Sequence, residues 1–342
     1  MSNLSFRLCA FNAAVAVALL AGCGGSQPPI SAPAAIPQTS AVARHADRGK
    51  SWMEPDTKSS DLLYVAASPN GQNGSAYVYT YPKGHLVQIL TGFAEPFGEC
   101  ADSAGDVFIV AYTNGSMTSS TIYEYAHGGT SPIATLNDPK TALGCAVDPT
   151  TGNLAVSGDG VAIFKNASGN PTMYYSSEFS FAYCGYDDRS NLYLTAVDSQ
   201  YGDQFALVRL SERSADFERI TLDAKLYSSD NIWPTVQWDG KHVAVTSDPY
   251  RKAISLYRLR IAGSSATVVS STTLSTRENN YSGETWIQGK SIIGVGHAKR
   301  HYEAAFLWSY PKGGDPDRTI QRVGETLYPL VSGVTVSVAP SH

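Results

Sequence analysis

Residues 143–157, LGCAVDPTTGNLAVS, carry the pattern that decides the fold. A short apolar run ends at Asp148, a turn containing Gly152 and Asn153 follows, and a second apolar run begins at Leu154. Asp, Asn and Gly favour tight turns, and apolar runs this short are typical of buried strands. The stretch therefore predicts two antiparallel strands joined by a tight turn, with Asp148 capping the backbone N–H groups of that turn.

This unit recurs along the chain. The anchor position holds an acidic or polar residue each time: Asp102, Asp148, Asp187, Asp239 and Gln288, with separations of 46, 39, 52 and 49 residues. Each anchor ends one short strand and precedes three more, and the third strand of each unit is rich in aromatic residues. Four strands repeated about every 45 residues, with no helical period longer than one turn, indicate a β-propeller.

The two ends of the repeat array complement each other. The first unit begins at Leu62 and lacks its first strand, whereas Val331–Ser337 has no following partner. We expect Val331–Ser337 to pair with Leu62–Ala67, because closing the ring removes strand edges that would otherwise invite aggregation. The predicted fold class is all-β: residues 60–342 form a six-bladed β-propeller of four-stranded blades, closed by the C-terminal strand pairing in the first blade.

The N-terminus has the features of an export signal. Residues 1–23 hold one charge, Arg7, before a 15-residue, largely apolar segment that is too short to span a membrane. The segment ends in Leu20-Ala21-Gly22-Cys23, which resembles a bacterial lipobox, so we expect Cys23 to be lipidated. Residues 24–59 are rich in Pro, Ala and Ser and predict a flexible tether.

The lipobox resemblance predicts an exported protein that is held on a membrane of the bacterial cell envelope through its lipid. Residues 24–26 include no Asp. By resemblance to Gram-negative lipoproteins, this favours the outer membrane if the cell has one. The chain has a net charge of −5 and only 16% charged residues, compared with about 25% in an average soluble domain. We therefore expect no nucleic-acid partner, because such a surface needs clustered Lys and Arg.

The blade rhythm resembles the six-bladed propellers of the NHL-repeat and gluconolactonase-like type, with the turn between Asp148 and Leu154 as the clearest match. This fold hosts hydrolases, lyases, binding platforms and scaffolds. Gluconolactonase-like enzymes hold a divalent metal at the tunnel mouth, where the nearest candidates here are Glu95, Glu99 and Glu284. The alternative function implied by this resemblance is therefore a hydrolase or lyase with a divalent ion such as Ca²⁺; otherwise we expect no cofactor.

Aromatic residues gather in the loops that a propeller places on one face. The candidates for ligand binding are Tyr112, Tyr183, Tyr201, Trp233, Tyr250, Tyr281 and Tyr328. Flat rings with a polar rim suit a glycan, a peptide or a protein partner, because they bury area at low entropy cost. Packing between blades also uses aromatic residues and is the alternative. We expect an envelope binding or scaffold module rather than an enzyme.

Three cysteines lie on the first strands of consecutive units, and export permits disulfides. Cys145 and Cys184 stand three residues before their anchors, whereas Cys100 stands two before its own. Alternate strand residues face opposite sides, which favours a Cys100–Cys145 bridge with Cys184 free. Taking Asp188 as the anchor would instead make Cys145–Cys184 a competing pair, and three buried thiols remain the third possibility.

Overall fold

The computed structural model describes residues 52–53, 57–69, 73–113, 116–199, 204–211, 215–227, 233–247, 254–275, 281–297, 303–321, 323 and 329–340. Cys23 and most of the expected signal peptide and tether lie outside these residues. The described residues form strands and two short 3-10 helices, Thr57–Ser59 and Lys165–Ala167. None of the helices in this part of the chain is long and apolar enough to cross a membrane.

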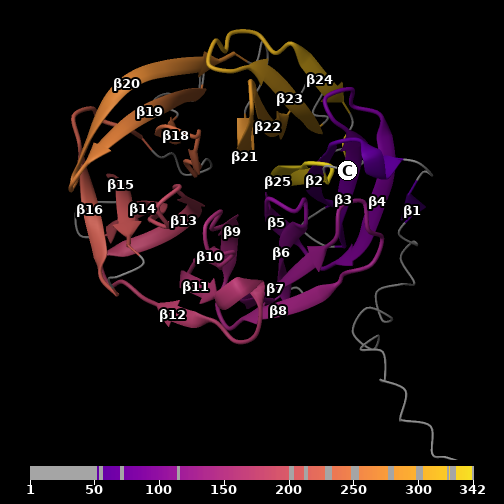
Figure 1. The fold of residues 1–342 in the computed structure, drawn as a ribbon, viewed down its shortest axis with the longest axis horizontal. Coiled ribbons are helices and arrows are strands. Elements are labelled where there is room, and N and C mark those ends of the chain that lie inside the picture. The colour runs from indigo at the N-terminus through magenta and orange to yellow at the C-terminus, as the bar shows by residue number, and fades with distance from the viewer. Residues whose placement is uncertain are drawn as a thin grey trace, which may run out of the picture. The chain divides into compact units, whose positions relative to one another are not determined.

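The strands form sheets that stand around a common centre (Figure 1). The first sheet has the order β1-β4-β3-β2-β25, where the strands are β1 (Trp52–Met53), β2 (Leu62–Pro69), β3 (Gly74–Thr80), β4 (Leu86–Phe93) and β25 (Pro329–Ser337). The next sheet runs in chain order through β5 (Pro96–Ala101), β6 (Val107–Thr113), β7 (Ser116–Tyr125) and β8 (Ala134–Asp138). The third consists of β9 (Ala142–Val147), β10 (Leu154–Gly158), β11 (Gly160–Phe164) and β12 (Thr172–Tyr174).

The fourth sheet has eight strands. Its first half comprises β13 (Phe179–Tyr186), β14 (Leu192–Asp198), β15 (Gln204–Leu210) and β16 (Phe217–Leu222). Its second half comprises β17 (Val236–Trp238), β18 (Val243–Ser247), β19 (Ile254–Ala262) and β20 (Ser265–Leu274). The last sheet comprises β21 (Tyr281–Gln288), β22 (Ser291–His297), β23 (Glu303–Ser309) and β24 (Arg318–Gln321).

The fold is an all-β propeller, but its sheets are not six separate blades. Each half of the eight-stranded sheet is an antiparallel meander. The halves join where outer strands β16 and β20 pair in parallel at Thr221↔Ser265 and Leu222↔Ala266. The structure thus has four separate sheets and one double sheet, because two outer edges approach closely enough to share backbone hydrogen bonds.

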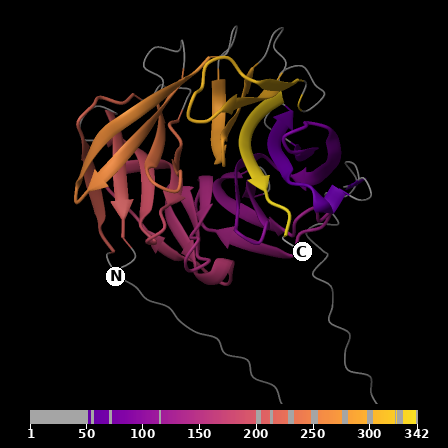
Figure 2. The same cartoon turned by 45° about the horizontal axis from the view of Figure 1, so that its top comes forward.

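The expected closure of the ring is confirmed. Strand β25 pairs antiparallel with β2 from Leu62↔Ser337 to Pro69↔Pro329, and Figure 2 shows β25 in yellow beside the indigo first sheet. The end of β25 is tied down further, because Ser337 Oγ lies 2.6 Å from His127 Nδ1. The segment thus completes the first sheet although it is the last strand of the chain.

The anchor acids cap turns, as their spacing predicts. Asp148 Oδ1 accepts the Thr150 N–H at 2.9 Å, and Gly152 adopts a φ of +71° in the same turn. The carboxylates of three further anchors also accept backbone N–H groups of their own turns: Asp102, Asp187 and Asp239. These acids are therefore occupied in holding the chain reversals.

The first strands of the repeats lie close together around the centre. A Cβ atom added to Gly98 of β5 would lie 2.4 Å from the Leu143 carbonyl oxygen at the start of β9. Gly185 and Gly333 meet backbone carbonyls of the next inner strand in the same way, whereas a Cβ atom at Gly144 or Gly283 would first meet the side chain of Tyr183 or Val295. A side chain at Gly98, Gly185 or Gly333 would collide with the neighbouring backbone, so these inner strands lie close together around the bore.

Candidate functional site

Hydrogen bonds from Ser and Thr hydroxyl groups connect neighbouring inner strands near their β-bulges. In β13 the register shifts between Phe181 and Cys184, which frees the Tyr183 N–H from regular pairing. Thr195 Oγ1 accepts this N–H at 3.1 Å and donates to the Pro234 carbonyl at 2.6 Å. Ser157 and Ser332 likewise donate to carbonyls of neighbouring inner strands. These contacts join adjacent repeats around the bore.

Two of the predicted acids, Glu99 and Glu284, meet at the ring closure. Glu284 Oε2 accepts the N–H of Glu99 in β5 at 2.9 Å and that of Val334 in β25 at 3.2 Å. Glu99 is fully buried, and its carboxyl oxygens have no hydrogen bond of good geometry, although the Ala66 N–H faces them. Burial raises the pKa of Glu99 to about 8. Burial and the neighbouring Glu99 also raise the pKa of Glu284 well above its usual value.

These acids do not fit the divalent-metal site that the gluconolactonase resemblance implies. Glu95 is only partly buried, and its carbonyl accepts the Tyr112 N–H. Within the described residues, no group of three or more His, Cys, Asp or Glu side chains is placed to hold a metal ion. Glu284 Oε2 is engaged by the N–H groups of Glu99 and Val334, and Glu99 is fully buried, whereas Ca²⁺ requires several converging charged or carbonyl oxygens.

A groove of about 360 Å³ lies where the chain passes from β10 to β11 and from β12 to β13. We call it the aromatic groove. Two of its aromatic side chains are exposed: Tyr175 by 56% and Trp233 by 39%. The Tyr175 ring lies against Gly160, since a Cβ atom there would be 3.0 Å from the ring. Gly160 also has a φ of +129°, so this turn requires glycine for two reasons.

Polar groups accompany these rings. Asp159 is exposed, and Thr141 and Ser180 also line the aromatic groove. Lys140 Nζ lies 5.8 Å from the centre of the Tyr175 ring. Beside them, burial and the charge of Asp159 raise the pKa of Asp138 to about 6. The groove therefore combines exposed aromatic rings with hydroxyl groups and the carboxylate of Asp159.

The aromatic residues that the sequence predicts for ligand binding differ in their exposure in the structure. Trp233 lines the aromatic groove, whereas Tyr112 and Tyr183 are buried by more than nine-tenths of their surface. Tyr112 contacts Phe97 at 4.5 Å between ring centres, and burial raises its pKa to about 12. Tyr112 and Tyr183 therefore serve in packing, which is the alternative to ligand binding that the sequence leaves open for the aromatic residues. The remaining predicted positions have no described side chain: Tyr201, Tyr250, Tyr281 and Tyr328.

Sequence reasoning missed Tyr175. The sequence predicts an outer strand over residues 172–175, which places Tyr175 in a strand rather than among the loop aromatics. In the structure β12 already ends at Tyr174, which leaves Tyr175 at the start of the following connection. The signal that would have identified it is the neighbouring Ser176, whose hydroxyl accepts the N–H groups of Glu178 and Phe179 and so turns the chain.

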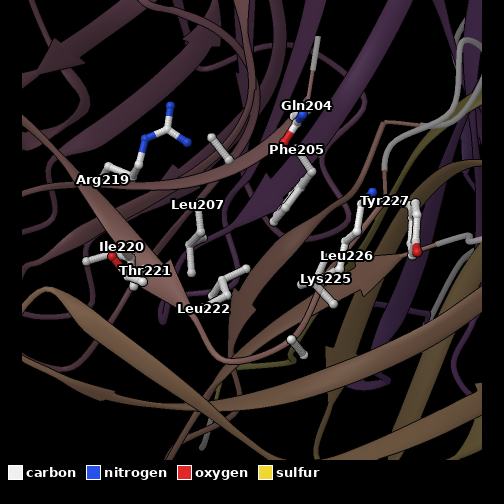
Figure 3. Close-up of a pocket in the computed structure, with 12 residues that line it drawn as sticks. Gln204, Phe205, Leu207, Arg219, Ile220, Thr221, Leu222, Lys225, Leu226 and Tyr227 are labelled. Atoms are coloured by element: carbon white, nitrogen blue, oxygen red, sulfur yellow. The ribbon is translucent and has the colours of Figure 1, made fainter. Parts of the chain in front are cut away.

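A second hollow, of about 370 Å³, lies along β15, β16 and the segment that follows them (Figure 3). Phe205, Leu207, Leu222 and Leu226 give it an apolar lining, and the guanidinium group of Arg219 turns away from them. Arg219 instead pairs with Asp198 and lies 4.9 Å from the Phe179 ring, which belongs to the aromatic groove. Arg219 of β16 therefore contacts one of the residues that line the aromatic groove.

The cysteine alternatives are resolved geometrically. Cys100 and Cys145 form a disulfide with Cα atoms 5.7 Å apart, and Cys184 is a buried free thiol. Burial raises the pKa of the Cys184 thiol to about 12. The bridge joins β5 to β9 and so links two consecutive sheets next to the bore.

Comparisons with known proteins inform the fold alone. The chain matches no protein-family model and no curated protein sequence. A solved protein from Lactobacillus plantarum is similar with a TM-score of 0.50 and 12% identity, over 76% of this chain and 82% of that one. A Bacteroides uniformis protein provisionally described as a 6-phosphogluconolactonase has a TM-score of 0.49 and 12% identity, over 77% and 83% of the two chains. The WD40 domain of Toxoplasma gondii coronin has a TM-score of 0.46 and 14% identity, over 83% and 74%.

Proposed function

We propose that this protein is a lipid-anchored, six-bladed binding module of the bacterial cell envelope, which takes a glycan in its aromatic groove. The observation that carries the proposal is the exposure of Tyr175 and Trp233 in one groove that also holds the carboxylate of Asp159 and several hydroxyls. Exposed aromatic faces stack on the apolar faces of sugar rings, and the polar groups around them satisfy sugar hydroxyls.

Two further features support the architecture in this proposal. Each half of the eight-stranded sheet is a complete four-stranded meander. Counting each half as one blade gives six four-stranded repeats, with β1 as an additional short strand on the first. This count agrees with the NHL-like rhythm of the anchor residues.

A glycan array carrying bacterial surface oligosaccharides tests the ligand. The purified protein is applied to the array, and the affinity of the best hit is measured by calorimetry. Tyr175→Ala and Trp233→Ala each remove one exposed ring, which we expect to weaken binding about three- to tenfold. Ile133→Ala is the matched control, because Ile133 is 58% exposed but does not line the groove. Equal binding by all four proteins would refute the groove as the glycan site.

Metabolic labelling tests the anchor separately. A clickable fatty-acid analogue is expected to label the wild-type protein but not Cys23→Ala, because the thiol carries the lipid. Equal labelling of the two proteins would refute lipidation at Cys23, whatever the array shows about the groove.

A further inference from the structure

A third cavity, of about 240 Å³, lies where the inner strands of the propeller end. We call it the bore cavity, and it is distinct from the aromatic groove. Four aromatic residues of three inner strands line it: Tyr183, Tyr186, Trp238 and Trp286. Trp238 and Trp286 are only half-buried. The cavity therefore reaches solvent at the end of the bore where β17 and β21 finish.

Trp286 extends across the bore. It packs against the apolar cluster formed by β2, β22, β23 and β25, and also against the cluster that contains Cys100 and Cys145. Trp286 belongs to β21, and the second cluster includes residues of β9, which lies on the other side of the centre from β21 (Figure 1). The indole N–H donates to Gln288 Oε1 at 3.2 Å. The side chain thus forms a wall of the bore cavity with its one polar atom satisfied.

The charged side chain that lines the described part of the bore cavity is acidic. Glu284 lines the cavity, and among the described residues that line it there is no Lys, Arg or His. Glu284 Oε2 is held by the N–H groups of Glu99 and Val334, which fixes the carboxyl group in place. The other titratable groups near it are Glu99, Tyr183 and Cys184, and none of them supplies a positive charge.

We propose that the bore cavity binds a small organic cation, a quaternary ammonium ion of about the size of choline. Aromatic side chains attract such ions through the negative faces of their rings, and a fixed carboxylate adds a full opposite charge. The small volume admits a compact cation and excludes an oligosaccharide. This ligand is chemically different from the glycan of the aromatic groove, and the two sites bind independently.

Binding of a cation is coupled to release of a proton. Burial and the adjacent Glu99 favour the protonated carboxyl group of Glu284 when the cavity holds no cation. An ammonium ion stabilises the ionised form, so the proton leaves to solvent as the cation enters. The affinity therefore rises with pH in the range below the pKa of Glu284. A neutral ligand of the same shape has no such dependence.

Calorimetry with choline and with its uncharged carbon analogue 3,3-dimethylbutan-1-ol tests the proposal. We expect saturable choline binding, at least about tenfold weaker binding of the alcohol, and a choline affinity that rises with pH, with proton release on binding, in the range where the carboxyl group of free Glu284 is protonated. Equal affinity for both compounds, a pH-independent choline affinity, or no binding of choline by the folded protein would each overturn the proposal.

Single substitutions test whether choline binds in the bore cavity. Glu284→Gln keeps an oxygen that accepts the two N–H groups but removes the charge, so we expect about tenfold weaker choline binding and no proton release. If this variant does not fold, Trp238→Leu provides the second test and is expected to weaken binding several-fold. Ile133→Ala is the control and leaves choline affinity unchanged, because Ile133 is exposed and lines neither the bore cavity nor the aromatic groove. Unchanged affinity in Trp238→Leu, or loss in Ile133→Ala, would contradict a site in the bore cavity.

Discussion

A second disulfide is expected when Ala146 is replaced by cysteine, because the repeat places Ala146 opposite Cys184 as it places Cys100 opposite Cys145. In the native bridge, Cys145 Sγ lies 3.8 Å from the carbonyl oxygen of Phe108, the residue paired with Cys100. One repeat later, Cys184 Sγ lies 3.8 Å from the carbonyl oxygen of Ala155.

Ala155 is in turn the residue paired with Ala146. Ala146 also packs against the apolar cluster that contains Cys184. The two sites are thus related by one repeat, and the change Ala146→Cys supplies the missing thiol.

The expected stabilisation follows from the length of the closed loop. The two positions are 38 residues apart, compared with 45 in the native bridge. A cross-link across a loop of this length lowers the entropy of the unfolded chain by an amount equivalent to about 4 kcal/mol. For a domain of this size, that corresponds to an increase of about 7 °C in melting temperature. Strain in the native state would reduce this value.

Peptide mapping of the non-reduced, alkylated protein together with thermal melts measures the outcome. The melting temperature of Ala146→Cys should exceed that of wild type without reductant, and the difference should disappear with it. Ala146→Ser is the matched control, since it has similar volume and no thiol. The register argument is refuted if the introduced cysteine and Cys184 are both alkylated in folded, oxidised protein, or if Cys184 is found bridged to Cys145.

Two further predictions concern stability. Deleting residues 330–342 removes β25 and exposes the β2 edge, so we expect loss of cooperative unfolding; a melting temperature within about 2 °C of the intact protein would contradict this. Burial raises the pKa of Glu99 to about 8, above its unfolded value, so its contribution to stability is present at low pH and is lost as the pH rises from about 4.5 towards 8. Denaturant titrations of Glu99→Gln should show a correspondingly smaller fall in stability over this range; an identical pH slope would disprove the assignment.

Local patterns made much of the fold predictable. The anchor acids and the glycines after them specify turns through neighbouring backbone atoms, so Asp148 could be assigned from a few residues of sequence. The missing first strand at Leu62 and the surplus strand at Val331–Ser337 likewise followed from counting repeats. These features depend on short-range hydrogen bonding and on strand periodicity, which the chain encodes directly.

The candidate sites depended on distances between remote segments. Tyr175 and Trp233 meet in one groove although they are separated by all of β13, β14, β15 and β16. Tyr183, which the sequence predicts as a ligand-binding residue together with Trp233, lies instead on a bulged inner strand and is buried. A loop aromatic in the sequence does not reveal which way its ring turns, because a register shift of one residue reverses the face it occupies.

The sequence by itself determined the repeat, the turns and the strand that closes the ring, since each rests on contacts within a few residues or on the period of the pattern. Only the tertiary structure decided that β16 and β20 join, that Cys145 bridges Cys100, and that Glu99 and Glu284 share one desolvated region. Each of these pairs is brought together by the angle and spacing between repeats. Those quantities come from packing of whole sheets around the bore, where glycines such as Gly98 let the inner backbones touch, and no local pattern specifies them.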